Sequence, residues 1–146
     1  MTIDPILNAP AEVQLHLLAA LAALALTPVM LWRPKGTLRH KALGRIWVAA
    51  MALTAVSSFW VMEIRLIGPW SPIHILSLIT LVSLFQAVRA ARARNIVAHK
   101  QYIFGAMMGL LGAGLFTLAP GRILSDSLFA GFETRAFAIV LVLGSA

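Results

Sequence analysis

The sequence predicts an all-α integral membrane protein, a four-transmembrane-helix up-down bundle. Composition is the first reason: 60% of the 146 residues are hydrophobic and 12% are charged, whereas soluble domains have about half and about a quarter. The second reason is four apolar runs with lengths near the ~20 residues that cross a hydrocarbon core of about 30 Å as a helix. These runs also lack the alternation of barrel strands.

The four expected spans, in chain order, are Ala11–Trp32, Ala42–Ile64, Ile73–Val88 and Gln101–Ala119. Short segments rich in proline and glycine separate or end them, namely Arg33–Arg39, Gly68–Pro72 and Pro120-Gly121. We therefore expect a transmembrane domain over residues 1–122. Residues 123–146 contain an apolar stretch too short to span alone. They are predicted to lie at the interface or to dock on a partner.

Charge predicts the orientation of the chain. Nine of the twelve basic residues fall between the first two runs or between the last two, or in the first turn of the second run: Arg33, Lys35, Arg39, Lys41, Arg45, Arg89, Arg92, Arg94 and Lys100. All five acids fall on the other side. The positive-inside rule then places both basic loops in the cytoplasm of a bacterial inner membrane and both termini outside. The net charge of +7 is therefore interpreted as a topology signal, and nucleic-acid binding is not expected.

The four histidines, His16, His40, His74 and His99, each lie near the start of one apolar run. The separations of His16 from His74 and of His40 from His99 are 58 and 59 residues, and within each hairpin they are 24 and 25. A duplicated helical hairpin explains this spacing, whether or not the histidines are functional. Because successive spans cross in opposite directions, the first and third histidines fall near one face and the second and fourth near the other.

Two imidazoles at one level of a bundle can hold a b-type haem, one on each side of the iron. With both axial positions filled, such an iron serves electron transfer. The two levels are about 25 Å apart, from roughly 17 helical residues at 1.5 Å each. One or two haems b are therefore expected, alongside the alternatives of no cofactor or another metal. Zinc or copper is disfavoured, because neither pair has a third histidine or an obvious carboxylate ligand.

Small and basic residues near the histidines are further candidates for haem contacts. Gly105 and Gly109, with Gly112, form a stripe on the fourth run, and Gly44 follows His40 by one turn. Such residues leave room for a ring, or for ordinary tight helix packing. Arg45 and Lys100, like Arg39 and Lys41, are candidates to neutralise haem propionates or simply to set topology.

The segments His40-Lys41-Ala42-Leu43-Gly44-Arg45 and His99-Lys100-Gln101-Tyr102 each open a helix. With this four-helix frame they resemble a bacterial family of predicted membrane proteins, domain of unknown function 2306. The resemblance covers the chain from the first helix to about Arg122, with Tyr102 where we expect a tryptophan. It implies a membrane fold and no particular activity.

The histidine pattern also resembles the transmembrane cytochromes b that ascorbate reduces. This resemblance implies an outer haem on His16 and His74 and an inner haem on His40 and His99. The chain differs in having four spans and no evident ascorbate motif, so the expected donor is only a quinone or a small reductant.

Other classes of function find little support. The sequence contains no catalytic triad pattern, phosphate-binding glycine loop or metalloprotease motif. Hydroxyl residues inside the spans, such as Thr54, Ser57 and Ser77, usually bond their own helix backbone and do not mark a transport path. The competing hypothesis is a small accessory or assembly subunit of a larger respiratory or photosynthetic complex, or a homo-oligomer, with no cofactor of its own.

Overall fold

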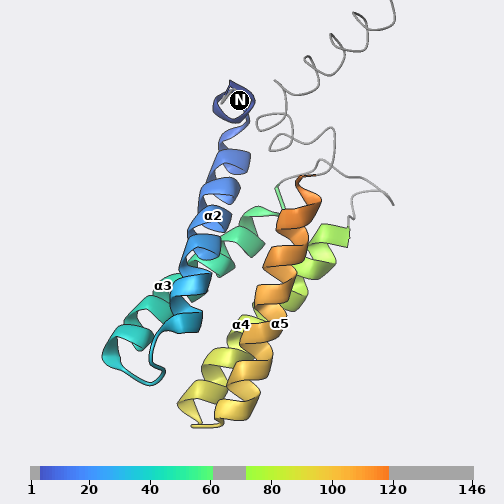
Figure 1. Cartoon of the computed structure of the whole chain (residues 1–146). Helices are drawn as coiled ribbons and strands as arrows, with labels where there is room; N and C mark the ends of the chain where they lie inside the picture. The colour runs from blue at the N-terminus through green and yellow to red at the C-terminus, as the bar shows by residue number, and fades with distance from the viewer. Residues whose placement is uncertain (1–3, 61–71, 119–146) are drawn as a thin grey trace, which may run out of the picture. The chain divides into compact units, whose positions relative to one another are not determined.

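A computed structural model describes residues 4–60 and 72–118, except for the side chains of residues 72 and 73. Every regular element in these ranges is a helix (Figure 1). A short helix, α1, precedes four long ones: α1 is Asp4–Leu7, α2 Ala11–Trp32, α3 Leu38–Ser57, α4 Pro72–Arg92 and α5 Ile96–Phe116. Residues Ala11–Gly112 form one compact unit that contains the candidate site.

α2 and α3 form a hairpin whose turn is fixed by its own residues. The Lys35 ammonium donates to the Leu31 carbonyl at the end of α2. Gly36 has φ of +83°, a left-handed conformation that glycine adopts without a steric penalty. The Thr37 side chain then accepts from the His40 backbone N–H at 3.1 Å and caps the start of α3. The chain therefore reverses over five residues, and α3 begins at Leu38.

A buried hydrogen bond joins α2 to α3. The Trp47 indole Nε1 donates to Thr27 Oγ1 at 3.0 Å, and that hydroxyl donates to the Ala23 carbonyl at 2.8 Å. Ala19 and Ala23 on α2 are also buried, and their small side chains permit close approach of the two helices. This bond fixes how α3 is rotated about its axis.

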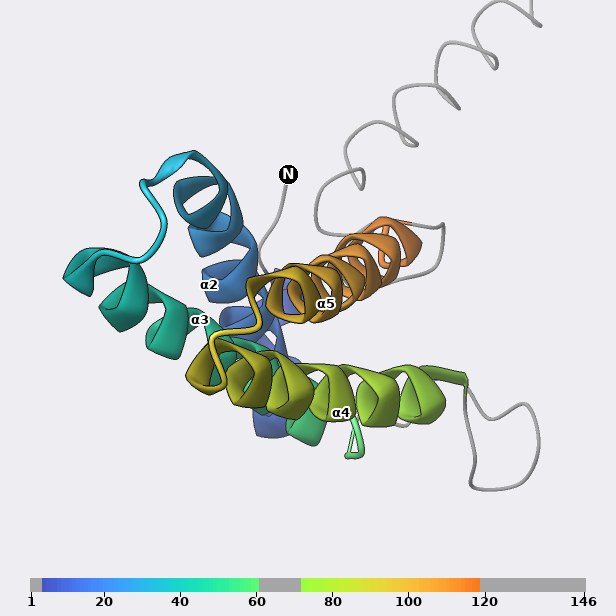
Figure 2. The ribbon, with the colours of Figure 1, turned by 90° about the horizontal axis from the view of Figure 1, so that it is seen from below.

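α4 and α5 form a second antiparallel hairpin, and both views show them side by side (Figures 1 and 2). Arg94 has φ of 57° and closes α4, with the Asn95 N–H donating to the Ala90 carbonyl at 2.9 Å. Asn95 Oδ1 then accepts from the Ala98 N–H at 3.1 Å and caps α5. Farther along, a Cβ on Gly109 would lie 3.5 Å from Leu76 Cδ1, so Gly109 packs against the side chains of α4.

The interior of the unit is partly polar, and much of its surface is apolar. A core cluster takes one or more side chains from each long helix: Ala23, Trp47, Met51, Leu84 and Ala106. Buried polar side chains accompany it: Thr27, Ser57, Ser58, His74, Ser77 and Thr80. Large apolar side chains face outward, among them Leu18, Ile75, Leu78, Phe85 and Phe104. Apolar surface on this scale is typical of a lipid-facing protein.

The described helices agree with the expected runs to different degrees. α2 has the predicted bounds, whereas α3 and α5 begin before Ala42 and Gln101 because Thr37 and Asn95 cap them earlier. α2 and His74–Arg92 of α4 are long and apolar enough to cross a membrane. Four basic or histidine residues open α3, and two open α5, so these helices are less apolar at their starts. The ends of the second and fourth expected spans, and the segment 123–146, lie outside the described residues.

Candidate functional site

His40 and His99 occupy equivalent places in the two hairpins, each in the first turn of a helix that begins at a loop. The caps described above put them there. Because the caps start α3 at Leu38 and α5 at Ile96, both histidines belong to regular helix and not to the loops. Both rings are half-buried.

His40 is half-buried, and its electrostatics are influenced by His99 on another helix. His40 precedes the apolar run that starts at Ala42, and its pKa is lowered from 6.5 by burial first, then by the charges of His99 and Lys35. His40 Nδ1 is also buried and has no hydrogen-bond partner in the described part of the protein. A buried ring nitrogen without a partner is costly. Such an atom is a candidate for coordination, since either imidazole nitrogen can bind a metal.

The His99 ring is held in one orientation by α4. Its Nδ1 lies 2.9 Å from the Ala87 carbonyl oxygen. A carbonyl only accepts, so we assign the ring proton to Nδ1, which leaves the Nε2 lone pair for a ligand. Histidines that bind metals usually donate their other N–H to a carbonyl or carboxylate in this way. The contact between His99 and the Ala87 carbonyl is therefore one that metal-binding histidines also make.

His16, at the other histidine level, contacts α3. Its Nδ1 is 3.0 Å from Ser57 Oγ, and that hydroxyl donates to the Leu53 carbonyl at 2.7 Å. Because the serine proton is directed to the carbonyl, we assign His16 Nδ1 as the donor to Ser57. His16 then carries its lone pair on Nε2, as His99 does.

His74 is buried with 7% of its surface exposed. Its ring stacks on Phe59, with centroids 5.3 Å apart and planes 21° apart. One turn later on α4, Ser77 Oγ lies 2.5 Å from Ser58 Oγ at the end of α3. His16 therefore bonds Ser57, and His74 lies one turn before Ser77, which bonds Ser58. Both histidines are thus linked to the end of α3, where Ser57 and Ser58 are consecutive.

The hydroxyl residues do more than the sequence pattern indicated. Thr54 and Ser57 bond their own helix, to Ala50 and Leu53 respectively, as expected. The contact of Ser57 with His16 and that of Ser58 with Ser77 join different helices, however. Sequence spacing does not reveal these contacts, because they depend on how the helices are rotated.

The glycine and basic candidates fall in different surroundings. A Cβ on Gly44 would lie 3.4 Å from Met30 Cε, whereas one on Gly105 would have nothing within 4 Å. Of the predicted stripe on α5, Gly109 packs on α4, while Gly105 and Gly112 have open space. The Arg45 and Lys100 side chains are exposed, Arg45 directly after Gly44 and Lys100 beside His99.

Metal sites built from three or more protein ligands are absent from the described residues. Within residues 4–60 and 72–118, no group of three histidine, aspartate or glutamate side chains could hold a metal ion. A haem iron needs only two protein ligands, because the porphyrin supplies the others. This finding therefore leaves the histidine pairs open as haem ligands.

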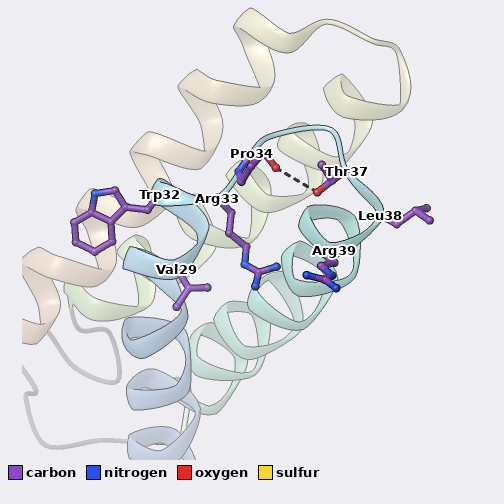
Figure 3. Close-up of a pocket in the computed structure, with 7 residues that line it drawn as sticks. All are labelled: Val29, Trp32, Arg33, Pro34, Thr37, Leu38 and Arg39. Carbon is purple, nitrogen blue, oxygen red and sulfur yellow. Dashed lines mark hydrogen bonds between the residues drawn. The ribbon is translucent and has the colours of Figure 1, made fainter.

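A groove at the α2–α3 turn was not anticipated from the sequence. It has a volume of about 710 Å³. Two arginines and several apolar or small side chains line it (Figure 3): Val29, Trp32, Arg33, Pro34, Thr37, Leu38 and Arg39. The only sequence feature that could have predicted this groove is the presence of Arg33 and Arg39 on opposite sides of a turn. The same pattern is also expected for charges that set membrane topology or neutralise a haem propionate.

Comparison with known proteins adds one finding. The model of a family described as "Predicted membrane protein (DUF2306)" matches residues 13–144. Neither the curated proteins nor the solved structures contain a match to the chain. The likeness to the ascorbate-reducible cytochromes b therefore depends on the histidine pattern alone.

Proposed function

The chain belongs to the DUF2306 family of predicted membrane proteins, and we propose that it is a four-span, b-type haem protein that transfers electrons. One observation carries the haem proposal. His40 has a buried ring nitrogen without a hydrogen-bond partner among the described residues, and the charge of His99, which lies on another helix, contributes to lowering the His40 pKa. Two imidazoles from facing helices are the ligand set that a bis-histidyl haem requires.

The membrane arrangement is supported by surface and charge. Large apolar side chains on α2, α4 and α5 face outward, whereas polar side chains such as Thr27, Ser77 and Thr80 are buried. α3 and α5 each follow a basic turn, so the proposed bundle has both turns in the cytoplasm of a bacterial inner membrane. His40 and His99 then lie near the cytoplasmic face.

The residues present fit a haem at this level. His40 and His99 would hold the haem iron, and the Ala87 carbonyl holds the His99 ring. Arg45 and Lys100 provide positive charge near the same level for two propionates. A haem held by these two histidines would supply one-electron transfer between separate donors and acceptors. A quinol or another small reductant at the membrane is the proposed donor class.

A second haem is proposed on His16 and His74, at the outer level. Its support is the tautomer of His16 and the burial of His74. Phe59 stacks on His74 and would hold that ring in place. Two haems would allow electrons to cross the membrane, and one would confine transfer to the cytoplasmic side.

The test is an optical spectrum of detergent-purified protein, oxidised and then reduced with dithionite, with a pyridine haemochrome assay for stoichiometry. We expect sharp reduced α and Soret bands and one or two haems per chain. His40→Ala and His99→Ala should each remove the same haem. His16→Ala is the matched control and should leave that haem in place. Protein that is colourless after expression with ample haem contradicts the proposal.

A second candidate is the accessory subunit, which the open face of α5 favours. A Cβ added to Gly105 or Gly112 would have no neighbour within 4 Å, and small-residue faces often pack against other transmembrane helices. This hypothesis expects a colourless protein that co-purifies with a larger membrane complex. Blue native electrophoresis of detergent-solubilised membranes distinguishes it from the cytochrome.

A further inference from the structure

We propose that the groove at the α2–α3 turn binds the phosphate head group of an anionic phospholipid. The groove has a volume of about 710 Å³ and is open on its outer side. Arg33 and Arg39 line it from the two sides of the turn. No histidine is among its described lining residues, but Arg39 directly precedes His40 and Thr37 caps the His40 N–H, so the groove adjoins the proposed haem level.

The charge of the groove is not matched by the protein itself. Of the described carboxylates, the nearest in sequence is Glu12 on α2, 21 residues before Arg33, which is about 30 Å along a helix at 1.5 Å per residue. Two guanidinium groups that share one groove repel each other unless an anion lies between them. Arginine binds phosphate with paired, parallel hydrogen bonds, and phosphate is therefore the anion that this pair fits best.

The groove is shaped before any ligand binds. Thr37 Oγ1 accepts from the His40 N–H at 3.1 Å and donates to the Pro34 carbonyl at 3.3 Å. The Lys35 ammonium bonds the end of α2, and Lys35 is not among the residues that line the groove. We therefore do not expect it to be a third ligand of the anion. Because the turn is held by these bonds, a ligand that orders the two arginines restricts their side chains but little of the backbone.

The apolar rim distinguishes a lipid from free phosphate. Trp32 is 85% exposed and Leu38 84% exposed, and Figure 3 shows them extending outward on opposite flanks of the turn. Val29 continues the apolar lining along α2. Exposed tryptophan at a helix end is typical of the bilayer interface. An acyl chain can cover these side chains, whereas inorganic phosphate would leave them in water.

The experiment measures binding of short-chain phosphatidylglycerol to delipidated full-length protein in detergent, by microscale thermophoresis. Inorganic phosphate and short-chain phosphatidylcholine are the comparison ligands. The test variant is Arg33→Gln with Arg39→Gln. The matched control is Arg92→Gln with Arg94→Gln, which removes the same charge from exposed positions at the α4–α5 turn. Far-UV circular dichroism verifies that each variant is folded.

We expect phosphatidylglycerol to bind at least about tenfold more weakly to the test variant, as the loss of charge-assisted hydrogen bonds implies. The control should bind within about twofold of the wild type. If the test variant is unfolded, Arg39→Lys replaces it and should weaken binding while keeping the charge. Equal loss in the control would show a diffuse charge effect and overturn the site. Inorganic phosphate binding as tightly as the lipid, or phosphatidylcholine binding equally well, would overturn the choice of ligand.

Discussion

Thr27→Val tests how much the hydrogen bond between α2 and α3 stabilises the hairpin that carries His40. Valine has a similar shape but no oxygen, so the buried Trp47 indole loses the acceptor 3.0 Å away. Trp47 is only 4% exposed, and water cannot replace that partner. An unsatisfied buried donor costs about 1–3 kcal/mol in soluble proteins, and hydrogen bonds between membrane helices average about 0.6 kcal/mol. We expect the free energy of unfolding to fall by about 1 kcal/mol, roughly fivefold in the unfolding equilibrium.

The assay is reversible unfolding in mixed detergent micelles, followed by far-UV circular dichroism. Thr54→Val is the matched control, because the Thr54 hydroxyl bonds only the Ala50 carbonyl of its own helix among the bonds described. Such local bonds contribute little, so the control should change by less than about 0.5 kcal/mol. A Trp47→Phe cycle should give a coupling energy of about 1 kcal/mol with Thr27→Val. Equal stabilities of the Thr27 and Thr54 variants would show that the bond between the helices contributes nothing.

Two further predictions concern the candidate site. In the protein without haem, nuclear magnetic resonance should show a His40 pKa below 6.5, and His99→Asn should raise it, because one lowering charge is lost while burial, the larger cause, remains. Below pH 6.5, folded His40 binds fewer protons than the same residue in the unfolded chain. Its contribution to the free energy of unfolding should therefore diminish as the pH falls through that value. An unchanged His40 pKa in His99→Asn would show that His99 does not influence His40. Gly109→Leu should lower the thermal midpoint in detergent, since the added side chain meets Leu76, while Gly105→Leu should change it little because that position is open. The reverse order of these two variants would contradict the helix pairing.

The helices were largely predictable from the sequence, and their starts were less so. Apolar runs locate α2 at Ala11–Trp32, because a span excludes charge over nearly its whole length. The apolar run that predicted α3 starts only at Ala42 and therefore omits the first turn of the helix. That turn follows the Thr37 cap and contains charged residues. Hydropathy measures burial in lipid, whereas a cap acts through one backbone hydrogen bond. The two signals therefore place a helix start at different residues.

The sequence predicted which histidines form the candidate site, but it did not predict the contacts that these histidines make. The repeat spacing picked out His40 and His99, but nothing in that spacing indicates that the Ala87 carbonyl holds the second ring. The Arg33 and Arg39 groove was missed because a positive charge next to a span has the same pattern whether it sets topology or binds an anion. A groove depends on the three-dimensional course of the turn.

Membrane character and the expected pairing of histidines by level follow from the amino-acid order alone, because composition and spacing along a helix are properties of a single chain segment. Which atoms a ligand can reach depends instead on how the helices pack. The Thr27–Trp47 bond sets the rotation of α3, and the contact of Gly109 with Leu76 sets that of α5 on α4. A rotation of one helix by about 100° replaces the residue on its inner face with the next one, so only packed helices determine that His40 faces inward.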